Sequence, residues 1–191
     1  MDAFSTSRDG GGVQLYNILD ATDLAALRHR ANLVSFRKIP VGLNQSIMLA
    51  AMPNDISITL RNAAEFGVHH PLQLLSSMLR LNTTVCDAEP RIHTDNDIGG
   101  VRPVYGSVSY LEDGPPGLHG TALYEHPEYG RGSDDVSVFT DNTGWEPWYI
   151  NQAKANSMFL FKSNLYHGRY PWTTYGVSQL TGRKVVVQFY R

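Results

Sequence analysis

Three residues carry side chains that could together hold a metal ion. His93 and Asp95 are two residues apart in the sequence His93-Thr94-Asp95, and residues two apart on a strand point to the same face. His167 follows a strongly apolar segment much later in the chain and offers a third ligand. Two imidazoles and one carboxylate form the facial triad that holds iron(II) and leaves positions open for dioxygen and a chelating cosubstrate. The three residue types therefore predict an iron(II) site, although His-x-Asp alone often occurs by chance.

The remaining histidines and the single cysteine have simpler interpretations. The other five histidines are His29, His69, His70, His119 and His126. We interpret them as structural or surface residues, with a contact to the substrate or to the ligands as the alternative for His119 and His126. Cys86 is the only cysteine, which excludes an internal disulfide and a Cys-x-x-Cys zinc site.

The first 77 residues are expected to supply helices that support a core. Residues 1–12 are polar and glycine-rich and predict a flexible tail. Asp20 is placed to cap a helix that ends near Ala31, with Leu24 and Leu27 on one face. Further expected elements are a strand at Asn32–Ile39, an apolar run at Ser46–Met52, a helix over Asp55–Phe66 stopped by Gly67, and a short helix over Leu72–Ser77.

From residue 78 onward, short β-prone runs alternate with turns rich in Gly, Pro, Asp and Asn. Strands are expected at 78–86, 91–94, 104–111, 120–125, 134–139, 147–150, 157–162 and 183–190. Short strands at this spacing predict an antiparallel sandwich or barrel. We therefore expect one domain with a tail at 1–12, helical support at 13–77 and a β-core at 78–191.

Composition narrows the classes of function. The chain has 191 residues, of which 42% are hydrophobic and 18% charged, which suits one folded domain. Its net charge of −2 disfavours nucleic acid as a partner, although a local basic groove would still be compatible with it. The amino terminus lacks the apolar region of a signal peptide, and no apolar run approaches the roughly 20 residues of a membrane span. We expect a cytoplasmic protein with no membrane partner.

The order of several motifs resembles one enzyme family. The motifs are His93-Thr94-Asp95, Tyr110-Leu111, His119-Gly120-Thr121, the later His167, and Gly182-Arg183 at the start of a closing strand. This order is similar to that of the iron(II)- and 2-oxoglutarate-dependent oxygenases, in particular the compact prolyl-4-hydroxylase-like branch. The resemblance covers residues 78–191. It implies a mainly β fold, in which a double-stranded β-helix (jelly-roll or cupin-like) core follows amino-terminal α-helices.

The resemblance implies roles for individual residues. His93, Asp95 and His167 would bind Fe(II), and Tyr105 or Tyr110 would hydrogen-bond the cosubstrate 2-oxoglutarate. The carboxylate of Asp95 favours hydroxylation, because halogenating members of the family have a small residue in its place.

The distal carboxylate of 2-oxoglutarate has three candidate anchors. Arg183 is the one that the resemblance implies, because a guanidinium matches a carboxylate with two parallel hydrogen bonds. Its distance from His167 along the chain is longer than is usual in the family, so Arg169 and Lys184 are rivals. Strand alternation puts Arg183 on one face with Val185 and Lys184 on the other, which favours Arg183.

Two other features leave alternatives open. Arg80, Asn82 and Thr84 share one face of the strand before the His-x-Asp motif, and they either line the pocket or belong to the surface. Trp145 and Trp148 lie in a long irregular loop, Tyr124–Trp148, that could recognise substrate. The alternative is that these tryptophans cap the open end of the barrel.

The resemblance implies a dioxygenase that hydroxylates an unactivated C–H bond of a peptidyl or amino-acid-like substrate and releases succinate and carbon dioxide. Its partners would be dioxygen and a peptide or small-molecule substrate. The main alternative is a non-catalytic jelly-roll module that binds sugar or peptide, and a third possibility is a cupin with another metal. A binding module needs neither the distal histidine nor the basic strand start. A cupin usually carries His-x-His, which this sequence lacks.

Overall fold

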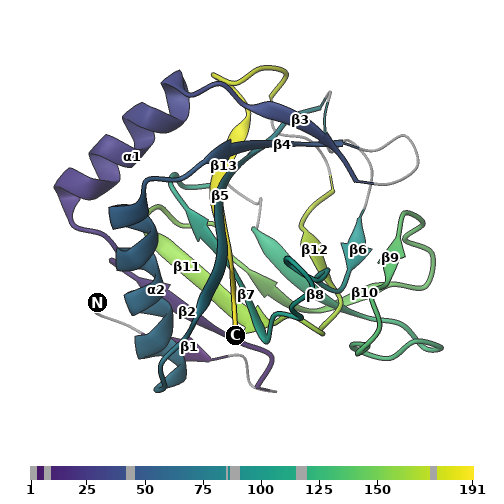
Figure 1. Ribbon diagram of the computed structural model, residues 1–191. Helices are drawn as coiled ribbons and strands as arrows, with labels where there is room; N and C mark the ends of the chain where they lie inside the picture. The colour runs from purple at the N-terminus through teal and green to yellow at the C-terminus, as the bar shows by residue number, and fades with distance from the viewer. Residues whose placement is uncertain are drawn as a thin grey trace.

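The computed structural model describes residues 4–6, 10–41, 46–84, 86, 91–114, 120–172 and 176–191. Strands and two helices follow one another in these residues (Figure 1). In chain order they are β1 (Phe4–Thr6), β2 (Gly12–Tyr16), α1 (Ala21–Leu33), β3 (Arg37–Pro40), β4 (Ser46–Ala51), α2 (Asn54–Val68), β5 (Leu74–Asn82), β6 (Ile92–His93), β7 (Tyr105–Tyr110), β8 (Thr121–Glu125), β9 (Val138–Phe139), β10 (Glu146–Asn151), β11 (Ser157–Lys162), β12 (His167–Arg169) and β13 (Arg183–Tyr190). Neither helix in this part of the chain has the length and apolarity needed to cross a bilayer.

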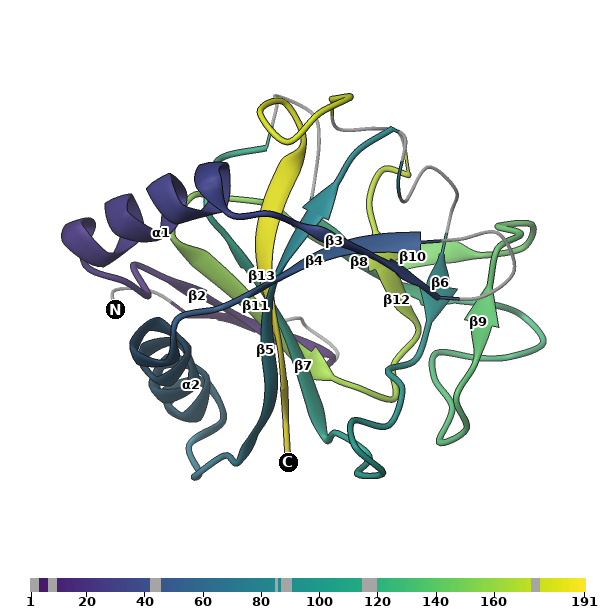
Figure 2. The ribbon, with the colours of Figure 1, turned by 45° about the horizontal axis from the view of Figure 1, so that its top comes forward.

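The strands form two antiparallel sheets. The larger sheet has the order β1-β2-β11-β7-β13-β5-β4-β3, and the smaller has the order β10-β8-β12-β6-β9. Both helices lie on the side of the larger sheet that faces away from the smaller one (Figure 1), and a second view shows the same layering (Figure 2). The mainly antiparallel, jelly-roll-like architecture that the sequence predicts is confirmed.

Helix α1 begins where its sequence signal indicates. The carboxylate of Asp20 accepts a hydrogen bond from the backbone N–H of Asp23 at 2.8 Å, and it thereby satisfies one of the amides that have no partner within the helix. Leu27 and Ala31 are buried on the face toward the sheet, and Leu24 packs partly buried beside them. The predicted N-cap and the predicted apolar face of this helix are both confirmed.

Helix α2 ends differently from the sequence expectation. Gly67 lies inside the helix and is buried, whereas the chain leaves the helix at His69, whose φ of 61° is left-handed. A Cβ at residue 67 would lie 3.1 Å from Cδ1 of Leu15, so glycine here serves close packing between α2 and β2. His69 and His70 therefore follow the end of α2.

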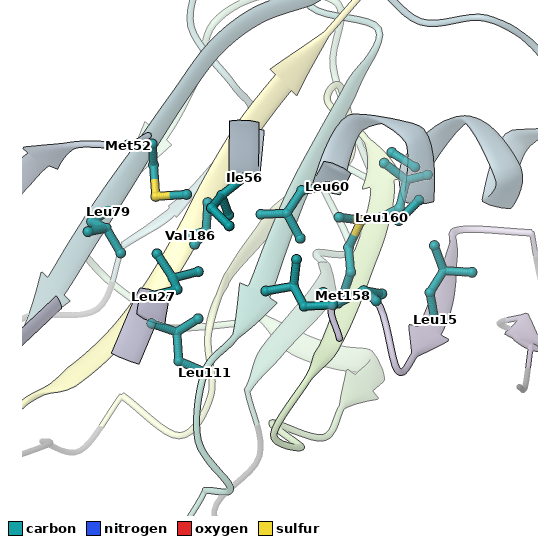
Figure 3. Close-up of a cluster of buried hydrophobic side chains, with 14 of the residues drawn as sticks. Leu15, Leu27, Met52, Ile56, Leu60, Leu79, Leu111, Met158, Leu160 and Val186 are labelled. Carbon is teal, nitrogen blue, oxygen red and sulfur yellow. The ribbon is translucent and has the colours of Figure 1, made fainter. Parts of the chain in front are cut away.

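The helices attach to the larger sheet through its main apolar cluster. Leu27 of α1 and Leu60 of α2 are buried against Leu79 of β5, Val186 of β13 and Met158 of β11 (Figure 3). Full burial of a leucine contributes about 1.5–3 kcal/mol. The cluster therefore stabilises the outer face of this sheet and leaves its inner face available for the smaller sheet.

Two expectations for the amino-terminal segment are wrong. The segment Leu72–Ser77 forms no helix, because β5 begins at Leu74 and pairs with β13 along its length. Such long-range pairing overrides the local preference of a short segment. Residues 1–12 are not wholly a flexible tail either, because Phe4–Thr6 pairs with β2. Three more strands before residue 74 (β2, β3 and β4) join the larger sheet, so residues 13–77 contribute strands as well as helices.

Candidate metal centre

Two candidate ligands come from neighbouring strands of the smaller sheet. Strands β6 and β12 lie side by side (Figure 2). His93 ends β6 and His167 begins β12, and the two histidines lie directly opposite each other in the strand pairing. Their ring centroids are 4.3 Å apart. Asp95 follows β6, where its backbone N–H donates to the carbonyl of Ser163 at 2.9 Å. The structure thus brings together the three residues that the sequence singles out, and it adds the strand β12 that sequence reasoning did not predict.

The ligand atoms of these side chains converge. One ligand atom from each of His93, Asp95 and His167 lies within 4.8 Å of the others, and Nε2 of His167 lies 3.3 Å from Oδ1 of Asp95. Nδ1 of His93 lies 3.3 Å from the carbonyl of Arg91, and Nδ1 of His167 lies 2.8 Å from the carbonyl of Leu165. When each Nδ1 donates its proton to that carbonyl, Nε2 keeps its lone pair for a metal.

Asp95 has coordinating capacity that the described protein atoms do not use. Its residue is 4% exposed, and Oδ2 has no hydrogen-bond partner among the residues that the structure describes. Burial of a carboxylate oxygen without a partner is costly, and a cation beside two imidazoles would offset that cost. The donor set therefore fits a divalent metal with nitrogen and oxygen ligands, such as iron(II).

The electrostatic surroundings favour a neutral His93. Burial lowers the pKa of His93 well below its usual value, and the neighbouring His167, Arg91 and Arg80 lower it further. The side chain nevertheless keeps some surface toward the cavity, so it is half-buried in terms of accessible area. A histidine must be neutral to bind a metal, so these neighbours favour the ligand form.

The three side chains lie in the wall of a cavity between the two sheets. Its basic lining residues are Arg80, Arg91, Arg169 and Arg183. Asn82 also lines it, whereas Thr84 is not among the lining residues. Of the two alternatives for the strand before the His-x-Asp motif, lining the pocket is therefore correct for Arg80 and Asn82, and a surface position is not.

Phe161 is a cavity residue that the sequence did not single out. It lies on β11, and its ring centroid is 4.5 Å from that of His167. Strand alternation puts Phe161 on the same face as Phe159, and both belong to the inner apolar cluster. That alternation was readable in the sequence, but which of the two faces meets the metal ligands was not.

Arg183 occupies the position that strand alternation predicts. It lines the cavity together with Val185, which is two residues further along β13. Its Nη1 donates to the carbonyl of Gly120 at 3.0 Å, and Nε and Nη2 approach Oδ1 of Asn82 at 3.4 and 3.3 Å. Lys184 is buried on the other face of the strand and is not a lining residue. These contacts fix the guanidinium at one end of the cavity.

The two candidate tyrosines lie on opposite faces of β7. The hydroxyl of Tyr110 lies 2.7 Å from Oγ1 of Thr121, which lines the cavity, and the guanidinium of Arg183 lies 6.0 Å from the ring of Tyr110. Tyr105 instead packs beside His70, with ring centroids 5.8 Å apart, and does not line this cavity. The structure therefore brings Tyr110 close to the candidate site and does not bring Tyr105 there.

Trp145 and Trp148 make packing contacts. Trp145 is 6% exposed, and its ring centroid lies 5.0 Å from that of His126. Nε1 of Trp148 donates to the carbonyl of Tyr124 at 3.2 Å. These contacts pack both tryptophans against the fold, and Trp148 lies on strand β10, so the long loop expected from the sequence is partly a strand. The candidate His119 lies outside the described residues.

Comparison with known proteins finds relatives at the level of structure alone. No protein-family model matches the chain, and no curated protein does. The epimerase SnoN from nogalamycin biosynthesis, described as non-haem and α-ketoglutarate dependent, is similar over 94% of this chain and 76% of its own, with a TM-score of 0.60 and 17% identity. HygX from Streptomyces hygroscopicus, solved with nickel, 2-oxoglutarate and hygromycin B, is similar over 94% and 82%, with a TM-score of 0.58 and 13% identity.

A prolyl-4-hydroxylase from Pseudomonas putida is also similar, over 95% of this chain and 92% of its own, with a TM-score of 0.53 and 16% identity. At these identities the comparison speaks for the fold. Because the match spans nearly the whole chain in each case, it includes the amino-terminal helices and strands that the motif resemblance did not cover. The chain therefore has the fold of the iron- and 2-oxoglutarate-dependent oxygenases.

Proposed function

We propose that the protein is an iron(II)- and 2-oxoglutarate-dependent dioxygenase that hydroxylates an unactivated C–H bond. The observation that carries this proposal is the cluster of His93, Asp95 and His167, of which Asp95 and His167 are buried and in which Oδ2 of Asp95 has no partner among the described residues. A non-catalytic binding module would have no use for such a costly group at the wall of its cavity. The shared fold supports the same proposal.

The chain's own residues would divide the work between them. His93 and His167 would present Nε2, and Asp95 a carboxylate oxygen, to the metal. Arg183 would bind the distal carboxylate of 2-oxoglutarate, since it lines the same cavity and is held by Asn82. Bound iron(II) and 2-oxoglutarate supply the oxidising chemistry: dioxygen is consumed, 2-oxoglutarate becomes succinate and carbon dioxide, and one oxygen atom enters the product as a hydroxyl.

The apolar part of the cavity would limit access of water to the reacting atoms. Val185, Val187 and Phe189 share the inner face of β13 with Arg183. An apolar wall that excludes water strengthens the interaction between Arg183 and a carboxylate, because charges interact more strongly where water is excluded. The hydroxyl of Tyr110 is hydrogen-bonded to Thr121, which lines the cavity. Tyr110 would therefore affect the cavity indirectly, by orienting Thr121.

The substrate would be an amino-acid-like or peptidyl molecule, or another small molecule. The prolyl-4-hydroxylase among the structural relatives supports the former class. The structures solved with nogalamycin RO and with hygromycin B support the latter.

The experiment is turnover of 2-oxoglutarate by the purified protein supplied with iron(II), followed as succinate formed. We expect slow succinate formation even without substrate, and its loss in His93→Ala and in Asp95→Ala. The matched control is His29→Ala, because His29 is exposed on α1 and should leave the rate unchanged. If the wild-type protein binds neither iron(II) nor 2-oxoglutarate in calorimetry, the proposed function is wrong.

A further inference from the structure

The described lining residues of the cavity carry more positive charge than the proposed cosubstrate needs. Four arginines line it, namely Arg80, Arg91, Arg169 and Arg183, whereas Asp95 is the acidic residue among the described lining residues. Iron(II), Asp95 and the doubly charged 2-oxoglutarate would together carry one negative charge. With both groups bound, the described lining of the cavity therefore still has a positive balance.

Two of these arginines stand beside the metal ligands. Arg91 is two residues before His93, and Arg169 is two residues after His167, so on extended strands each arginine shares a face with its histidine. His167 pairs directly with His93, and both Arg91 and Arg169 line the same cavity as these two ligands. A Cβ at Gly168 would lie 2.6 Å from the carbonyl oxygen of Arg91, which shows that the two segments remain in close contact there.

A third positive charge comes from the facing sheet. Arg80 on β5 lies opposite Val185 in the pairing with β13, and it lines the same cavity. Guanidinium groups bind a carboxylate or a phosphate with strong, directed hydrogen bonds.

We propose that Arg80, Arg91 and Arg169 bind an anionic group of the substrate, a carboxylate or a phosphate, beside the metal centre. This inference rests on the proposed function and names the chemical class of its substrate. Arg183, the first residue of β13 and held by Asn82, stays the proposed anchor of 2-oxoglutarate. The anionic group of the substrate and 2-oxoglutarate would thus bind to different arginines of one cavity.

The test is binding of three small probes to the protein loaded with nickel(II) and 2-oxoglutarate, so that no turnover intervenes. Benzoate, phenyl phosphate and benzamide share one ring and differ in the charged group. We expect at least one of the two anions to bind tenfold or more tightly than benzamide in calorimetry, and the tighter one identifies the carboxylate or the phosphate class. If neither anion binds more tightly than benzamide, the inference is overturned.

Variants assign the preference to particular residues. Arg91→Gln and Arg169→Gln should each remove most of the preference for the anion while 2-oxoglutarate binds as in the wild type, and Arg91→Lys should restore part of it. Arg80→Gln gives the same test from the larger sheet if a variant of the smaller sheet does not fold. The matched control is Arg30→Gln, because Arg30 is exposed on α1. A preference that survives in all three glutamine variants of the cavity would overturn the assignment.

The two proposals fail in distinguishable ways. Turnover of 2-oxoglutarate without a preference for the anionic probes overturns the inference about the substrate alone. A preference for the anions in a protein that binds neither iron(II) nor 2-oxoglutarate overturns the proposed function alone, because the probes can also be titrated into the metal-free protein.

Discussion

Gly106→Ala should weaken iron binding although residue 106 is not a ligand. A Cβ at this position would lie 2.7 Å from Oδ2 of Asp95 and 3.2 Å from the nearest ring carbon of Phe161. The backbone of Gly106 has little freedom to retreat, because it is paired with Phe161 of β11 on one side and with Phe189 of β13 on the other. The carboxylate of Asp95 must therefore move.

The size of that movement sets the expected effect. A carbon and an oxygen in contact are normally about 3.3 Å apart, so the carboxylate would shift by roughly 0.6 Å. Metal-binding groups must be held to within about 0.5 Å of their productive geometry, and changes beside metal ligands lower metal affinity by about 10- to 100-fold. We expect a loss in that range. Overpacking should also lower the free energy of unfolding by about 1–3 kcal/mol.

The assay is an iron(II) titration of the wild type and the variant, paired with urea unfolding of both. Gly67→Ala is the matched control, because its methyl would press on Leu15 at 3.1 Å, in the apolar cluster on the outer face of the larger sheet. Gly67→Ala should change the free energy of unfolding without changing the affinity for iron(II). A folded Gly106→Ala protein with wild-type iron affinity would refute the reasoning that residue 106 fixes the carboxylate of Asp95.

Three further predictions concern the anchor, the core and a helix cap. Arg183→Gln should weaken 2-oxoglutarate binding at least tenfold, since charged hydrogen bonds contribute about 1.5–3 kcal/mol. Lys184→Met should change the same affinity by less than about twofold. Calorimetry of the metal-loaded protein measures both affinities. Burial raises the pKa of the Tyr190 hydroxyl, so the unfolded state ionises first and the free energy of unfolding should fall as the pH rises past about 10. In urea unfolding, Tyr190→Phe should lose less stability over this pH range than the wild type. Asp20→Ala removes the cap of α1 and should lower the free energy of unfolding by about 1 kcal/mol in the same assay.

Strand alternation led to a sequence prediction about β13 that the structure supports. Because side chains alternate across a strand, Arg183 faces the cavity with Val185 while Lys184 faces away, as expected from their order alone. The same rule separates the two tyrosines. Tyr105 and Tyr110 are an odd number of residues apart on one strand, so they cannot share a face, and the structure brings only Tyr110 close to the cavity.

What the sequence could not show depends on contacts between distant segments. The segment Leu72–Ser77 lacks any local sign of its pairing with β13, so its helix was a reasonable but wrong expectation. Strand β12 is three residues long, too short for a periodic pattern to be visible. The sharing of one cavity by Arg80 and Arg169 follows from the packing of two sheets, which no local pattern encodes.

The geometry of the candidate metal centre thus depends on two very short strands, β6 and β12. The opposition of His167 and His93 depends on a pairing between β12 and β6 that extends over very few residues. A shift of one residue in β12 would turn every side chain of that strand to the opposite face. Both His167 and Arg169 would then leave the cavity together. The pairings of β12 with β8, at Leu123 and its neighbours, oppose such a shift, because they hold the other edge of β12 in the same register. The candidate metal centre and the proposed anion site therefore depend on one register, and loss of that register would remove both.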